Sequence, residues 1–149
     1  MINIVRKTRV GFLFAAILLL LGSGCANSGN KQANEKLIKD YYTSYEKKDS
    51  LLLCSILDAG FTFGSPVDVP NIDLKTYMKR CWPNAYNTKK FDIEKMMVDG
   101  DEGFVTYNGY TNDGKLFCNT EYFKFKDGKI IENVCYFGPG VSFPNNTAK

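Results

Sequence analysis

The chain of 149 residues contains no histidine, and this absence removes several kinds of active site. Histidine is the usual base that activates a serine or cysteine nucleophile, so a hydrolase triad of the ordinary kind is excluded. Cysteine is also scarce, and none of the four cysteines after Cys25 stands in a C-x-x-C pair. A zinc site would need thiolates from four distant segments. We therefore expect neither a metal nor a cofactor.

A hydrophobic run long enough to span a bilayer is missing as well. The apolar stretch from Val10 to Leu21 has 12 residues, whereas a transmembrane helix needs about 20. Three basic residues precede this stretch and the small residues of "LGSGC" follow it, which is typical of a secretory signal with its cleavage site. The cleavage site resembles the bacterial lipobox, in which the cysteine is acylated and becomes the new N-terminus. We predict a signal peptide at 1–24, a lipidated Cys25, and an exported protein anchored to a bacterial membrane.

An excess of positive charge is absent from the mature chain. Removal of 1–24 takes away three of the 19 basic residues and none of the 16 acidic ones, which leaves equal numbers. Nucleic-acid binding depends on clustered Lys and Arg that neutralise phosphates. We therefore expect no nucleic-acid partner, and the lipid bilayer at Cys25 is the first partner that the sequence predicts.

The remaining chain divides into three parts. Residues 25–34 carry the lipidated cysteine and small polar residues, which predict a flexible tether. Residues 35–140 have the length of one domain, and 141–149 form a C-terminal tail.

Helix-type spacing of apolar residues is found in the first half of that domain. The helix at 35–47 has an apolar stripe at intervals of three and four, with Asn34 as its cap. A second helix is expected with Ser50 as its cap and Gly60 as its stop, and a third covers 74–82. The stripe of the first helix consists of Leu37, Ile38, Tyr41, Tyr42 and Tyr45.

Strand-type patterns fill the second half. A short strand at "FTFGSP" ends at Pro66, and four runs rich in aromatic and β-branched residues follow, separated by "DGDEG", "NDG" and "DG" turns. The runs are 91–98, 103–111, 115–126 and 129–137. This order predicts an α+β domain in which three N-terminal helices pack on one face of a strongly curved, mainly antiparallel sheet.

The last two strands place a carboxylate on an aromatic face. A two-residue turn at Asp127 and Gly128 would pair Lys126 with Lys129. Alternation then puts Glu121 on the inner face with three phenylalanines of its own strand. The inner face is expected to comprise Phe117, Glu121, Phe123 and Phe125 with Ile130, Glu132, Val134 and Tyr136. A buried carboxyl is costly as an anion unless it finds a donor, so Glu121 should find one or hold a proton.

The same pairing places Cys118 and Cys135 as diagonal neighbours on the outer face. Such diagonals are about 7–8 Å apart, slightly beyond the reach of a disulfide. We predict free thiols there, and we expect Cys54 and Cys81 to be buried helix residues.

The three-helix start, the "FTFGSP" strand and the closing "YFKFKDGKIIENVCYFG" together resemble the nuclear transport factor 2-like superfamily, in particular its SnoaL-like, ketosteroid-isomerase-like branch. The resemblance implies a cone whose curved sheet wraps around the helices and leaves an apolar pocket. Members of the superfamily include isomerases, polyketide cyclases, dehydratases and non-catalytic binding domains, many of them dimers.

The isomerase branch implies roles for particular residues. That enzyme uses an Asp as general base, with a Tyr and a protonated acid in the oxyanion hole. The Tyr falls on Tyr41, the protonated acid on Glu121 and the base on Ser65. Serine at its ordinary pKa cannot take a proton from carbon, and Asp68 stands three residues further as a substitute. Tyr41, Glu121 and Asp68 are therefore the candidate catalytic residues.

Binding is favoured over catalysis because the base position is a serine and histidine is absent. We expect a small, largely apolar molecule to bind in the cone, in contact with Tyr41, Glu121, Phe123, Trp82 and Tyr136. One alternative is an isomerase or dehydratase. Another is a homodimer formed through the outer sheet face, with Tyr122, Ile131 and Phe137. A structural reading also stays open, in which Glu121 accepts the Tyr41 hydroxyl and only ties the helix to the sheet.

Overall fold

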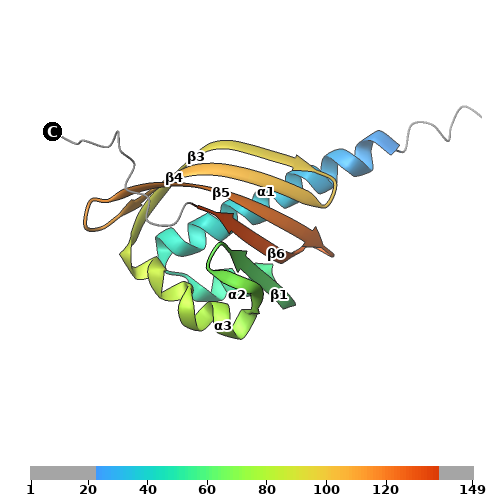
Figure 1. Ribbon diagram of the computed structural model, residues 1–149. Coiled ribbons are helices and arrows are strands. Elements are labelled where there is room, and N and C mark those ends of the chain that lie inside the picture. The colour runs from blue at the N-terminus through green and yellow to red at the C-terminus, as the bar shows by residue number, and fades with distance from the viewer. Residues whose placement is uncertain (1–22, 138–149) are drawn as a thin grey trace, which may run out of the picture.

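The computed structural model of the protein describes residues 23–137 (Figure 1). Residues 1–22, which are most of the predicted signal peptide 1–24, and residues 138–149, which include the predicted tail 141–149, lie outside the described residues. A six-stranded, strongly bent sheet in the order β2-β1-β6-β5-β4-β3 curves over the helices, with α1 running beneath its long strands (Figure 1). The predicted α+β class and the curved, mainly antiparallel sheet are confirmed.

The long helix α1 (Ser23–Lys47) carries the stripe that the sequence predicted. It turns Ile38 and three tyrosines into the core, and it ends where Lys48 adopts a positive φ of 58°. Two details differ from the prediction. The segment expected to be a flexible tether is helical, and Asn34 is not a cap: its buried side chain donates a hydrogen bond of 3.0 Å to the Gly100 carbonyl in the sheet.

Shorter elements follow α1. Helix α2 (Ser50–Ile56) is capped by Asp49 rather than Ser50, because the Asp49 side chain accepts the Leu52 N–H at 2.9 Å. Strand β1 (Leu57–Ser65) starts immediately, so Gly60 lies within a strand and does not stop the helix. Cys54 is exposed on α2 and not buried as expected.

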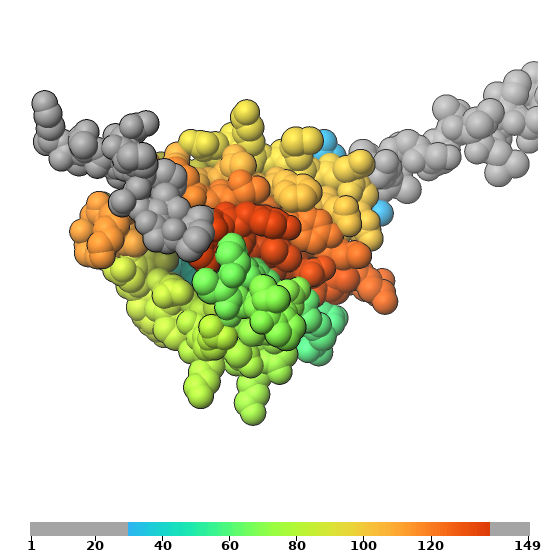
Figure 2. Space-filling model, viewed as in Figure 1, coloured from blue at the N-terminus to red at the C-terminus, as the bar shows by residue number. Residues whose placement is uncertain are grey.

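An edge hairpin was missed by the sequence interpretation. Strand β2 (Asp68–Asp73) pairs antiparallel with β1 at the edge of the sheet. The segment contains Pro70 and several polar residues, as edge strands often do, and these features indicated a loop. In the space-filling view the β1–β2 hairpin, in green, lies next to the red strand β6 (Figure 2).

The third predicted helix is divided in two. Helix α3 (Leu74–Arg80) begins at the cap residue Asp73, and a 3₁₀ helix η1 (Trp82–Asn87) follows it. The four strands of the meander then agree with the prediction to within a few residues. They are β3 (Thr88–Asp99), β4 (Glu102–Thr111), β5 (Leu116–Lys126) and β6 (Lys129–Tyr136), and β6 also pairs in parallel with β1.

A β-bulge changes the expected face of β6. The pairing Lys126↔Lys129 is confirmed, but Phe125 pairs with Ile130 while Lys124 pairs with Glu132, which leaves Ile131 as an extra residue. An extra residue reverses the alternation beyond it. The expected inward positions of Glu132, Val134 and Tyr136 are therefore wrong, and the fully or nearly buried residues of this strand end are Asn133 and Cys135.

The same reversal separates the two cysteines of the hairpin. Cys135 is buried on the inner face, whereas Cys118 is exposed. The thiols of Cys54, Cys81, Cys118 and Cys135 are all free, and Cys81 is partly exposed at the end of α3 and not buried as expected. Among the described residues, no helix combines the length and the apolar character that a membrane crossing requires.

Candidate functional site

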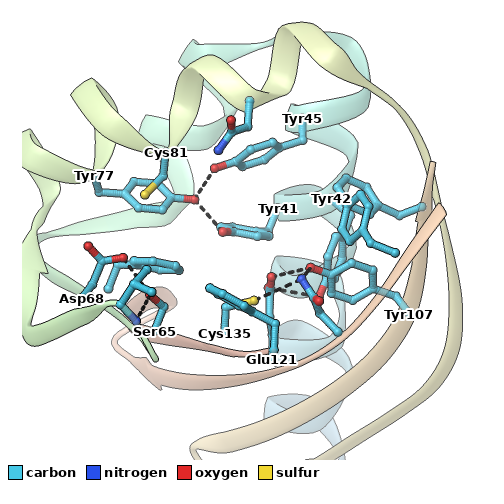
Figure 3. A pocket seen from close by; sticks show the side chains of 17 residues that line it. Tyr41, Tyr42, Tyr45, Ser65, Asp68, Tyr77, Cys81, Tyr107, Glu121 and Cys135 are labelled. Atoms are coloured by element: carbon cyan, nitrogen blue, oxygen red, sulfur yellow. Dashed lines mark hydrogen bonds between the residues drawn. The ribbon is translucent and has the colours of Figure 1, made fainter. Parts of the chain in front are cut away.

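A cavity of about 300 Å³ lies between α1, α3 and the concave face of the sheet (Figure 3). This volume is at the lower end of the range for small-molecule sites. Nine aromatic side chains form most of the wall, and a smaller set of polar groups and two thiols complete it. The aromatic residues are Tyr41, Tyr42, Tyr45, Phe63, Tyr77, Phe91, Tyr107, Phe117 and Phe137. The others include Ser65, Asp68, Cys81, Asn84, Asn119, Glu121 and Cys135.

Glu121 forms the first polar cluster, on the sheet side of the cavity (Figure 3). Its carboxyl, at the middle of β5, is only 6% exposed and accepts three hydrogen bonds. The Tyr107 hydroxyl donates to Oε1 at 2.8 Å, while the Tyr42 hydroxyl and Asn133 Nδ2 donate to Oε2 at 3.1 and 3.2 Å. The carboxyl is thus fully provided with donors, and each donor is a neutral group.

Burial decides the protonation behaviour of this cluster. Burial raises the pKa of Glu121 above its ordinary value of 4.5, and the hydrogen bonds from Tyr107, Asn133 and Tyr42 oppose that rise. Burial, followed by the charge on Glu121, also raises the pKa of both Tyr42 and Tyr107. Both tyrosines therefore keep their protons and remain donors.

Three tyrosine hydroxyls form the second cluster, deep between α1 and α3 (Figure 3). The Tyr77 hydroxyl lies 2.5 Å from the hydroxyls of Tyr41 and Tyr45. Burial raises the pKa of all three groups. The Tyr41 hydroxyl also donates to Asn133 Oδ1 at 3.4 Å, so Asn133 connects this tyrosine cluster with the Glu121 cluster.

The expected pairing of Tyr41 with Glu121 is wrong. Tyr42, the next residue along α1, makes that contact instead, and successive residues of a helix point about 100° apart. The apolar stripe contained both tyrosines and did not distinguish them. Tyr107 and Asn133 were missed altogether, because the inward position of Asn133 results from the bulge in β6.

Asp68 is at the centre of the third cluster, where β1 turns into β2. Ser65 Oγ donates to Asp68 Oδ2 at 2.7 Å, and Arg80 Nη2 lies 2.8 Å from Oδ1. The contact with Arg80 is an ion pair and not a directed hydrogen bond, since Oδ1 accepts none. Asp68 is only 6% exposed and lines the cavity beside Ser65, so the structure brings this candidate into the site.

Three predicted ligand contacts are not among the residues that line the cavity. Trp82 is buried against the Tyr45 ring, with 5.1 Å between ring centroids. Phe123 is fully buried against the Tyr41 ring, with 5.2 Å between ring centroids. Tyr136 is 52% exposed, because the bulge turns it outward. Packing and the bulge thus remove these three from the site.

Phe137 lines the cavity, although the sequence predicted it on an outer dimer face. That prediction for Phe137 is wrong. The homodimer itself stays a prediction. Within residues 23–137, no group of three His, Cys, Asp or Glu side chains comes together in a way that could hold a metal ion. The cavity therefore offers aromatic walls, tyrosine and amide hydrogen-bonding groups, and two carboxyl groups.

Comparison with known proteins identifies the fold. No protein-family model matches the sequence, and neither does any curated protein. Solved structures do match. A nuclear transport factor 2-like protein of unknown function from Cytophaga hutchinsonii is 19% identical, with a TM-score of 0.57 over 70% of this chain and 89% of that one.

Two other structures carry provisional enzyme assignments. A Kribbella flavida protein provisionally assigned as a ketosteroid isomerase is 13% identical, with a TM-score of 0.64 over 77% of this chain and 84% of that one. A Sinorhizobium meliloti protein provisionally assigned as a polyketide cyclase is 17% identical, with a TM-score of 0.56 over 67% and 93%. At these identities the likeness concerns the fold, and this chain has the nuclear transport factor 2-like cone fold that its sequence resembled.

Proposed function

We propose that this protein is an exported lipoprotein whose cone binds a small, largely apolar molecule. The observation that carries the proposal is the cavity of about 300 Å³ walled by nine aromatic side chains. Large rigid rings provide contact area at little entropic cost, and a few polar groups fix the orientation of the ligand. In this cavity the polar groups are the Glu121 cluster, the tyrosine cluster and the Asp68 cluster.

Binding can be tested with a neutral apolar fluorophore such as N-phenyl-1-naphthylamine, whose emission rises in an apolar site. The variant Cys81→Trp places a large side chain in the cavity wall at a thiol that makes no hydrogen bond in the described structure. We expect this variant to reduce binding by about tenfold or more. Cys54→Trp is the matched control, because Cys54 is exposed on α2 and does not line the cavity. Equal binding by the wild type and both variants would contradict the proposed site.

The membrane anchor is the second part of the proposal. Cys25 lies in the first turn of α1. This helix continues into the domain, where Asn34 donates a hydrogen bond to the sheet. At 1.5 Å per residue, the helix separates Cys25 from Asn34 by about 14 Å, so a lipid on Cys25 would hold the cone close to the bilayer. Cys25→Ala should abolish incorporation of labelled palmitate and release the protein from the membrane fraction. Unchanged labelling would refute the anchor.

An isomerase or dehydratase is the second candidate function, and one observation favours it. Asp68, three residues beyond the serine at the expected base position, lines the cavity. Its carboxylate could accept a proton from a carbon next to a carbonyl, while a tyrosine hydroxyl donates to the developing oxyanion. Turnover of a β,γ-unsaturated ketone to the conjugated isomer, lost in Asp68→Asn with apolar binding retained, would support it. No turnover by the wild type would leave binding as the function.

A further inference from the structure

The charges that line the cavity all have one sign. Of the described residues in its wall, Asp68 and Glu121 are acidic and none is Lys or Arg. Arg80 approaches Asp68 from a half-exposed position and does not itself line the cavity. Asp68 therefore has a partner charge, whereas the three donors to Glu121 are all neutral.

Aromatic rings around a carboxylate form an environment that favours positive charge. The faces of aromatic rings carry negative quadrupole potential, and cages of such rings bind quaternary ammonium groups. A carboxylate in a low-dielectric site adds an attraction that is stronger than it would be in water. Neutral apolar ligands gain nothing from Glu121, which is costly to bury as an anion. A cation in the cavity would supply the opposite charge that Glu121 lacks.

We propose that the ligand is an organic cation, an amine or quaternary ammonium carried on an apolar body, with Glu121 as its counter-charge. This inference rests on the proposed function, since it names the class of molecule that the same cavity takes. The cationic head would lie toward the Glu121 cluster, and the apolar body would contact the aromatic wall. Tyrosine hydroxyls could turn their oxygen lone pairs toward the head, because each is an acceptor as well as a donor.

The sharpest test compares two molecules of the same shape. Phenyltrimethylammonium and tert-butylbenzene differ in that a charged nitrogen replaces a neutral carbon. Both are titrated against the wild-type protein, with displacement of N-phenyl-1-naphthylamine as the readout. We expect the cation to bind at least about tenfold more tightly than its neutral isostere. Equal binding, or tighter binding of tert-butylbenzene, would overturn the inference and leave the proposed apolar site standing.

Substitution of Glu121 tests the counter-charge directly. Glu121→Gln keeps the size of the side chain and removes its charge. The affinity ratio of the cation to the isostere should fall about tenfold in this variant. In Asp68→Asn the ratio should change less, because Arg80 already neutralises Asp68. An unchanged ratio in Glu121→Gln would contradict the assignment of Glu121.

The pH dependence of ligand affinity tests the role of Glu121 in the wild-type protein, without a variant. Tyr42 from α1, Tyr107 from β4 and Cys135 from β6 adjoin Glu121, and the tyrosine cluster from α1 and α3 also responds to its charge. Burial raises the pKa of each of these groups. These groups stay neutral while Glu121 ionises. Affinity for phenyltrimethylammonium should therefore rise as the pH passes through the raised pKa of Glu121, whereas affinity for tert-butylbenzene should not. A flat profile of affinity against pH for the cation would count against the inference.

If the fluorophore itself fails to bind at any pH, the proposed function fails, and this inference fails with it.

Discussion

Two buried carboxyl groups line the same cavity and are stabilised in different ways. Glu121 and Asp68 are each only 6% exposed. Glu121 lies in the middle of the sheet and accepts hydrogen bonds from two tyrosines and an asparagine. Asp68 lies at the edge hairpin and has a serine and the half-exposed Arg80. The comparison shows that equal burial does not fix the role of a carboxyl, because the partners decide whether its charge is balanced.

The largest difference is expected when the centre of the Glu121 cluster is removed. Asn133→Leu takes one donor away from Glu121 Oε2 and one from the Tyr122 carbonyl, and it leaves the Tyr41 hydroxyl with Tyr77 as its remaining partner. We expect the free energy of unfolding to fall by about 3 kcal/mol, because buried polar groups lose their partners. Urea denaturation at neutral pH measures it. Asn71→Leu is the control: Asn71 is exposed and donates only to Glu132, so its loss should be within about 0.5 kcal/mol. Equal losses would refute the central role of Asn133.

A single donor to Glu121 should matter less. Tyr42→Phe removes one of the three hydrogen bonds and should lower the free energy of unfolding by about 1–1.5 kcal/mol. The variant should also raise the pKa of Glu121 further, since that bond opposes the effect of burial. Tyr86→Phe, at an exposed tyrosine, should leave both quantities unchanged. Denaturation curves together with carboxyl NMR titration check this, and an unshifted Glu121 titration would argue against the Tyr42 contact.

The Asp68 cluster should respond to salt, unlike the Glu121 cluster. Arg80→Met removes the cation next to Asp68 Oδ1 and should cost about 1 kcal/mol at low salt, because Arg80 is half exposed and water screens the pair. The cost should shrink as salt is added. Lys79→Met, at the neighbouring exposed position of α3, is the control and should cost less. A cost that is the same at low and high salt would contradict an ion-pair role for Arg80.

The smallest expected effect is a slope of stability with pH. Because the pKa of Glu121 is raised on folding, the folded protein holds this proton more tightly than the unfolded chain does. The folded protein therefore binds more protons between pH 4.5 and the raised pKa, so this contribution is complete below about pH 4.5 and is lost as the pH rises through the folded pKa. Glu121→Gln should flatten the slope and leave stability at neutral pH level or higher. A clear loss of stability in Glu121→Gln at neutral pH would indicate a structural anion instead.

The sequence by itself determined most elements of this fold and their order, with β2 and η1 as the exceptions. Helix-type spacing located α1 and α3, and the turn residues placed the four strands of the meander within a few residues of their observed bounds. Alternation in β5 correctly placed Glu121 on the buried face, because no bulge interrupts its pairing with β4. These features depend on local periodicity, which a single sequence contains.

The tertiary structure decided which side chains meet Glu121. One extra residue in β6 turned Asn133 and Cys135 inward and Tyr136 outward, and no local pattern in "KIIENVCY" marks that bulge. The rotation of α1 about its axis brings Tyr42, and not Tyr41, into hydrogen-bonding contact with Glu121, although both tyrosines belong to the same stripe. The edge hairpin brought Asp68 to Arg80 and into the cavity wall. Register, helix rotation and long-range pairing are set by packing between distant segments, and for that reason they could be known only from the folded molecule.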